Sequence, residues 1–208
     1  MPGNKLSMLE LLAEASKRPM DYPVLAAKLQ RDASLSYRLL RFINSPLVGL
    51  NSTVNSIQQA ISLLGEDEIG KFLALLAMAQ VGNKKPAALI TLVATRARFC
   101  ELMMTEAGKQ ELAQHAFLCG LLSLLEAMLD TPLDTLVPDL PVAPGIKASL
   151  LGEPGPLLDA LNIATAFESA DWERVDLTCQ QLGIDSLHAS HIQCQAMEWA
   201  CELEALAS

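Results

Sequence analysis

The stretch SYRLLRFINSP, residues 36–46, predicts how the first third of the chain folds. Four apolar residues in and just before it recur at the helical spacing i, i+4, i+7 and i+8: Leu35, Leu39, Phe42 and Ile43. A second face of the same helix carries Arg38, Arg41 and Ser45. Because the residue before a proline is disfavoured in the α region, we expect this helix to end by Ser45.

The same periodicity extends over most of the 208 residues, and no run alternates with the period of two that strands show. We expect helices up to Pro19, from Asp21 to about Gln30 with Asp21 as N-cap, and from a cap at Asp32 or Ser34. Further helices are expected at 56–65, 66–80, 87–106, 111–129, 157–169, 172–182 and 186–206, with short helices between the prolines of 132–156. Hydrophobic residues make up 51% of the chain but aromatic ones only 4%, which indicates an aliphatic core. We predict an all-α protein with a single helical domain.

Charge and composition bear on the partners. Residues 1–85 hold 10 Lys and Arg against 7 Asp and Glu, whereas residues 86–208 hold 5 against 17. We therefore expect no nucleic-acid partner, because binding nucleic acid requires clustered cations. The longest apolar runs, 72–79 and 116–125, are shorter than the roughly 18 residues of a membrane span, so we expect no membrane partner either.

The five cysteines form no CxxC pair, and the N-terminus lacks the pattern of a secretory signal. Both observations favour reduced, buried thiols in a cytoplasmic protein.

Residue types that support catalysis are scarce. His188 and His191 share a helix face at i, i+3 and are the candidate metal ligands, but one helix rarely completes a metal site. The chain has no GxSxG motif and no phosphate-binding glycine loop. We expect no catalytic residue, no metal and no cofactor.

The segment QRDASLSYRLLRFINSPLVGLNSTVNSIQQAISLLGEDEIGKFLALLAMA, residues 30–79, resembles the signature half of the HDOD domain, the HD-related output domain of bacterial signalling proteins. The matching elements are Asp32, Leu35, Ser36, RLLRFINSP, Gly49, Ser56, Ile57, Ala60 and LLG at 63–65. ARFCELM (97–103), AFLCGLLSLLEAML (116–129), GEPGPL (152–157), FESADWE (167–173) and Trp199 resemble the C-terminal HDOD region of proteins that also carry an EAL domain.

The resemblance implies a fold and a domain arrangement. The fold would be a helical bundle of the HD superfamily, of degenerate HD or HD-GYP type. Residues 1–20 would form a linker helix after a missing upstream EAL-type domain, and residues 21–206 would form the HDOD domain. Its signature half would span 21–82, and its C-terminal helical half 86–206.

The resemblance also bears on catalysis. Metal-dependent HD relatives carry adjacent His and Asp after an apolar run, and if GLLSL (120–124) is equivalent, Ser123 and Leu124 replace that pair. This replacement removes the metal ligands. We therefore expect that the chain is no enzyme and that any phosphodiesterase activity lies in the missing EAL domain.

The expected function is that of a non-catalytic regulatory domain in cyclic di-GMP signalling, acting by protein or interdomain contact. Its partners would be the upstream EAL domain of the same chain, another signalling protein or a second copy in a homodimer. One alternative is a nucleotide-binding sensory module that uses Arg38, Arg41, Asn44 and Ser45, since guanidinium groups suit phosphate. A residual metal-dependent phosphohydrolase is the other. For Asn44 we favour a structural role, in which its amide satisfies helix-end carbonyls or fixes the following loop.

Overall fold

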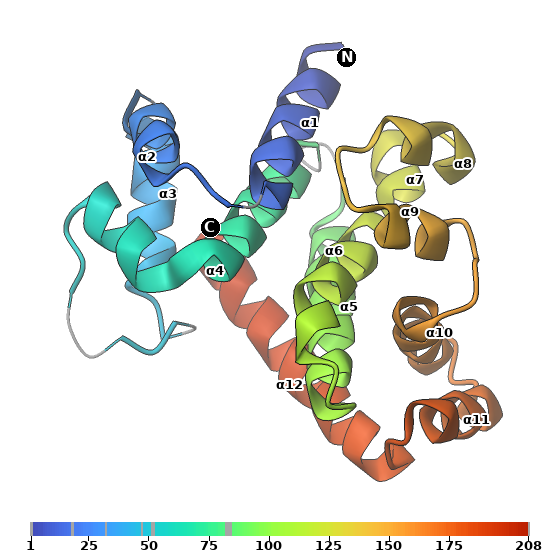
Figure 1. The fold of residues 1–208 in the computed structure, drawn as a ribbon. Coiled ribbons are helices and arrows are strands. Elements are labelled where there is room, and N and C mark those ends of the chain that lie inside the picture. Colours follow the sequence, from blue (N-terminus) through green and yellow to red (C-terminus); the bar gives the residue numbers. More distant parts are fainter. Residues whose placement is uncertain are drawn as a thin grey trace.

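The structure is a computed structural model, and it describes residues 2–17, 19–31, 33–46, 48–50, 53–81 and 85–207. In these residues every regular element is a helix (Figure 1), so the predicted all-α class is confirmed. The first third contains α1 (Pro2–Ser16), α2 (Tyr22–Arg31), α3 (Ala33–Ile43) and α4 (Ile57–Val81). The centre contains α5 (Ala87–Glu106), η2 (Gln110–Leu112), α6 (Ala113–Leu122) and α7 (Leu125–Leu129). Then follow α8 (Leu133–Leu136), η3 (Val137–Asp139), α9 (Pro144–Leu150), α10 (Pro156–Glu168), α11 (Trp172–Leu182) and α12 (Ser186–Ala207).

Local capping explains where several helices begin. The backbone N–H of Val24 donates to Asp21 Oδ1 at 3.0 Å, and that of Gln59 donates to Ser56 Oγ at 3.2 Å. These bonds satisfy amides in the first turns of α2 and α4, which lack partners inside the helix. The cap expected from Asp32 or Ser34 involves side chains outside the described part of the chain.

Two breaks shape the centre of the molecule. The expected boundary at Gly65 is a kink inside α4, where φ is 73° and ψ is 176°, a conformation that glycine adopts without a Cβ penalty. The single helix expected at 111–129 is wrong, because the chain leaves helical geometry between α6 and α7. There Ser123 Oγ donates to Gly120 O at 2.7 Å and so competes with the backbone ladder.

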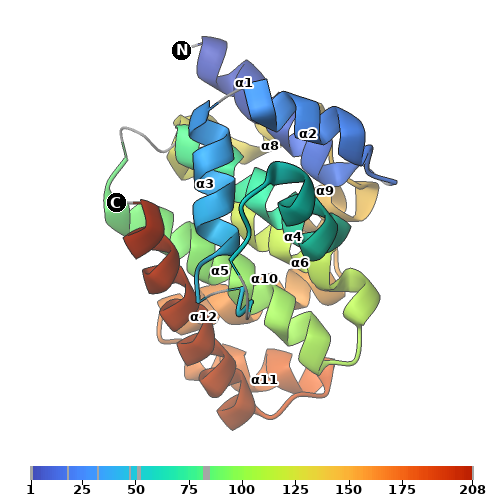
Figure 2. The same ribbon diagram turned by 90° about the vertical axis from the view of Figure 1, so that its left-hand side faces the viewer.

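One hydrophobic core joins the two halves of the chain, from Leu12 in α1 to Ala196 in α12. α5 lies at its centre and packs against α6, α10 and α12, while α1 packs against α4. Gly120 allows α6 to approach α5 closely, since a Cβ there would lie 2.6 Å from Arg96 O. α12 runs from the end of the molecule where α11 lies back toward α3, which it contacts (Figure 2). None of the helices in the described residues combines the length and the hydropathy that crossing a bilayer requires.

Candidate functional site

The C-terminal end of α3 is held by Asn44. Its Nδ2 donates to Leu40 O and to Val54 O, both at 2.8 Å, and its Oδ1 accepts from the N–H of Val54 at 2.7 Å. Ser45 is buried, and its Oγ donates to Phe42 O at 2.6 Å. The expected end of the helix by Ser45 and the expected structural role of Asn44 are therefore confirmed.

The two arginines of α3 do not converge on one point. Arg38 is exposed, whereas Arg41 Nη2 donates to Ala205 O at 3.3 Å, near the end of α12. Arg41 thus links the signature segment to the last helix. Nucleotide binding by this pair stays a prediction.

Ser123, the first of the two positions expected to replace the HD pair, takes part in a polar cluster that the sequence did not reveal. Arg96 of α5 donates through Nε and Nη2 to Glu168 Oε1 and Oε2, at 2.8 and 2.5 Å, and through Nη1 to Ser123 Oγ at 2.8 Å. Leu124 packs against the hydrophobic core. Because all three guanidinium nitrogens donate to these partners, the cluster fastens α5 to the ends of α6 and α10. The available sequence signal was an arginine that follows the largely apolar run AALITLVAT of α5.

The candidate metal ligands lie on the surface of α12. His188 and His191 are both exposed, and His188 Nε2 lies 3.3 Å from Glu106 Oε2 at the end of α5. Within the part of the chain that the structure describes, no group of three His, Cys, Asp or Glu side chains is arranged to hold a metal ion. The expectation that the chain binds no metal stays a prediction.

The thiols fall into two classes. Cys100, Cys119 and Cys179 are buried, and burial raises the pKa of each thiol, to about 11 for Cys179. The expectation of buried thiols is wrong for Cys194 and Cys201, which are exposed. They lie seven residues apart and hence on one outer face of α12.

A second charged cluster, here called the Glu101 network, joins α4, α5 and α12. Glu101 pairs through Oε1 with Lys71 of α4 and through Oε2 with Arg98 at 2.6 Å, and Lys71 also pairs with Glu68. The Arg98 guanidinium lies 5.7 Å from the ring centre of Trp199 in α12. Single charges within the apolar runs IGKFLALL and FCELMM were the available sequence signal.

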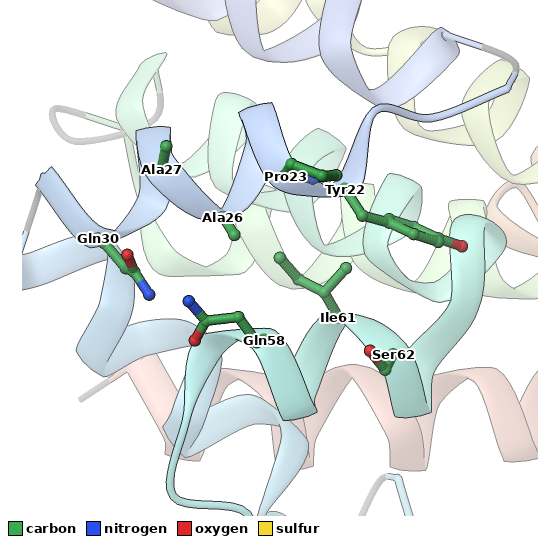
Figure 3. A pocket seen from close by; sticks show the side chains of 8 residues that line it. All are labelled: Tyr22, Pro23, Ala26, Ala27, Gln30, Gln58, Ile61 and Ser62. Atoms are coloured by element: carbon green, nitrogen blue, oxygen red, sulfur yellow. The ribbon is translucent and has the colours of Figure 1, made fainter.

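A pocket of about 380 Å³ lies between α2 and the first turns of α4 (Figure 3). Its described lining is Tyr22, Pro23, Ala26, Ala27, Gln30, Gln58, Ile61 and Ser62. The buried Ala26 and Ile61 form its floor, the amides of Gln30 and Gln58 lie at one end, and Tyr22 and Ser62 lie toward the other (Figure 3). We call it the α2–α4 pocket.

The fold and the α3 segment define a helical domain of the HDOD class, and the family model for the HDOD domain matches residues 1–128. The chain belongs to the HDOD family. It is 34% identical over 198 residues to the cyclic di-GMP phosphodiesterase CdgJ of Vibrio cholerae serotype O1, a match that covers 95% of this chain and 46% of the relative. It is 31% identical over 202 residues to the uncharacterized protein YuxH of Bacillus subtilis, covering 95% of this chain and 48% of the relative. The chain thus spans about half the length of these relatives.

Two solved structures share the fold. Both come from Shewanella amazonensis SB2B, and their names assign one to the phosphohydrolases and the other to the metal-dependent phosphohydrolases. The first has a TM-score of 0.70 at 17% identity and covers 97% of this chain and 93% of its own. The second has a TM-score of 0.57 at 15% identity and covers 97% and 90%. At these identities the likeness concerns the fold.

One expectation is overturned. We expected no enzyme because Ser123 and Leu124 replace the His-Asp pair, yet a relative that matches 95% of this chain is named as a phosphodiesterase. The inference from two residues was too broad, because losing one ligand pair removes only the chemistry of that pair. The expectation is therefore wrong.

Proposed function

We propose that this chain acts in bacterial cyclic di-GMP signalling as part of a cyclic di-GMP phosphodiesterase. The observation that carries the proposal is the 34% identity to the Vibrio cholerae phosphodiesterase across 95% of this chain. The match takes in both the α3 segment and the C-terminal helices, so it concerns the whole HDOD fold. Membership of the HDOD family supports the same assignment.

Within such an enzyme, this chain makes contact with an EAL-type domain, in the same polypeptide or in another signalling protein. The α3 surface favours this contact, because Tyr37 and Arg38 are both exposed on it and Tyr37 is 64% exposed. Tyr and Arg are enriched among the residues that dominate protein interfaces. The basic first third of the chain also suits an acidic partner surface.

The test is a domain exchange. The aligned segment of the Vibrio cholerae phosphodiesterase is replaced by this chain, and hydrolysis of cyclic di-GMP is followed by chromatography of the linear product. We expect the chimera to hydrolyse cyclic di-GMP at a rate within about tenfold of the parent enzyme's rate. The parent enzyme with the segment deleted should be more than about tenfold slower than the intact parent. A chimera that behaves like the deletion would refute the proposal.

Two surface variants locate the contact within the chimera. Tyr37→Ser removes the exposed aromatic ring from α3, and Leu187→Ser is the matched control, because Leu187 is 67% exposed on α12. We expect Tyr37→Ser to lower the rate at which the chimera hydrolyses cyclic di-GMP, and Leu187→Ser to leave that rate unchanged. The same assay on this chain alone, with Mg²⁺ or Mn²⁺ supplied, measures how much cleavage the chain performs itself.

A further inference from the structure

The α2–α4 pocket combines an apolar floor with free amides. Ala26 is 6% and Ile61 1% exposed, so the floor is fixed by the core of the domain. Tyr22, at the first position of α2, places its ring at one end of the pocket (Figure 3). The volume of about 380 Å³ falls within the range of roughly 300 to 1,000 Å³ that small-molecule sites occupy.

Gln30 of α2 and Gln58 of α4 face one another across the pocket (Figure 3). Among the described residues, neither side-chain amide has a hydrogen-bond partner, and both side chains are exposed. Each amide presents an acceptor beside two donors. Two such groups on opposite walls suit a flat ligand that carries adjacent donors and acceptors on its edge.

The chemistry of the lining narrows the class of ligand. The eight described residues that line the pocket offer amide, hydroxyl and apolar groups, and these groups suit a neutral part of a ligand. Purine bases match it, because a glutamine amide can form two parallel hydrogen bonds with a purine edge, while the flat face of the base packs on apolar side chains and aromatic rings.

We propose that the α2–α4 pocket binds a purine base, with Gln30 and Gln58 reading its edge and Ala26, Ile61 and Tyr22 contacting its face. The inference stands on the pocket and does not depend on the proposed phosphodiesterase role. Cyclic di-GMP, which carries two guanine bases, is one ligand of the proposed class.

The experiment titrates the purified chain with GMP, AMP, CMP and UMP, which carry the same phosphate and differ in the base. Binding is measured by calorimetry and by the ¹⁵N shifts of the glutamine side-chain amides, and cyclic di-GMP is titrated in parallel. We expect both purine nucleotides to bind at least about tenfold more tightly than either pyrimidine nucleotide.

Variants assign the site. Gln30→Ala and Gln58→Ala should each weaken purine binding roughly three- to tenfold. Ala27→Leu, which fills the pocket from an exposed position on α2, should abolish it. The matched control is Gln195→Ala at an exposed position on α12, which should leave affinity unchanged.

Circular dichroism confirms that each variant folds. The proposal is overturned if purine and pyrimidine nucleotides bind equally, if none of the four binds at millimolar concentration, or if Gln195→Ala weakens binding as much as the pocket variants do. Because the readout is binding and not hydrolysis, its outcome is independent of the domain exchange.

Discussion

Replacing Glu101 with glutamine tests the Glu101 network that joins α4, α5 and α12. The Glu101 side chain is 8% exposed and that of its partner Lys71 is 10% exposed, so the variant leaves an ammonium group in a largely buried place with one carboxylate removed. Removing one partner of a buried ion pair costs about 3 to 5 kcal/mol. Lys71 keeps Glu68, whose side chain is 42% exposed, and this places the expected loss near the lower end, about 3 kcal/mol.

For a chain of this length, a loss of that size lowers the melting temperature by roughly 6 to 12 °C. The measurement is urea and thermal unfolding at pH 7, followed by circular dichroism. Glu106→Gln is the matched control on the same helix, because Glu106 is exposed and its contact with His188 is a surface pair worth at most about 1 kcal/mol. A Glu101→Gln variant that loses no more stability than Glu106→Gln would refute the reasoning.

The pH dependence gives a second check on the same network. Burial alone would lower the pKa of Lys71, but the carboxylates of Glu101 and Glu68 outweigh it and raise that pKa above its usual 10.5. A group whose pKa is raised by folding contributes stability that is present below its unfolded pKa and is lost as the pH rises through its folded pKa. We therefore expect the stability difference between the native chain and Glu101→Gln to shrink above pH 10.5. A difference that stays constant to higher pH would contradict this account.

Three further predictions follow from individual contacts. Asn44→Ala should destabilise the chain by about 1 to 2 kcal/mol in urea unfolding, because three hydrogen bonds are lost, whereas Asn55→Ala at an exposed position should have little effect. Arg96→Lys should cost about 2 kcal/mol in the same assay, since an ammonium cannot reproduce the forked contact with Glu168; equal stability would contradict the geometry. A thiol reagent at pH 8 should label Cys194 and Cys201 rapidly and the three buried cysteines only after unfolding; rapid labelling of a third thiol would show that the core opens.

Local patterns were sufficient for most of the helices. The face formed by Leu39, Phe42 and Ile43 is buried as its spacing predicts, and the Asp21 cap is present, because both depend on residues a few positions apart. The break at Ser123 was missed. Its hydroxyl bond to Gly120 is local, but the contact with Arg96 comes from another helix and carries no periodic signal.

The site residues, too, could be predicted where their contacts are local in the sequence and could not where the contacts are distant. The role of Asn44 could be predicted from a helix end followed by proline. The pairing of Arg96 with Glu168 could not, since the two residues lie 72 positions apart and a single sequence does not specify which distant charges meet. The α2–α4 pocket was missed for a similar reason, because Gln30 and Gln58 are ordinary surface residues until α2 and α4 are placed side by side.

The bond from Arg41 to the carbonyl oxygen of Ala205 spans 164 residues. During synthesis, the ribosome must therefore add a further 164 residues after Arg41 before the acceptor of this bond exists. The first third leaves the ribosome well before α12 and must stay unaggregated meanwhile, although chains commonly begin to fold from the N-terminus as they emerge. The docking of α12 against α3 is thus a late step, which can follow only after α5 to α11 have been synthesised.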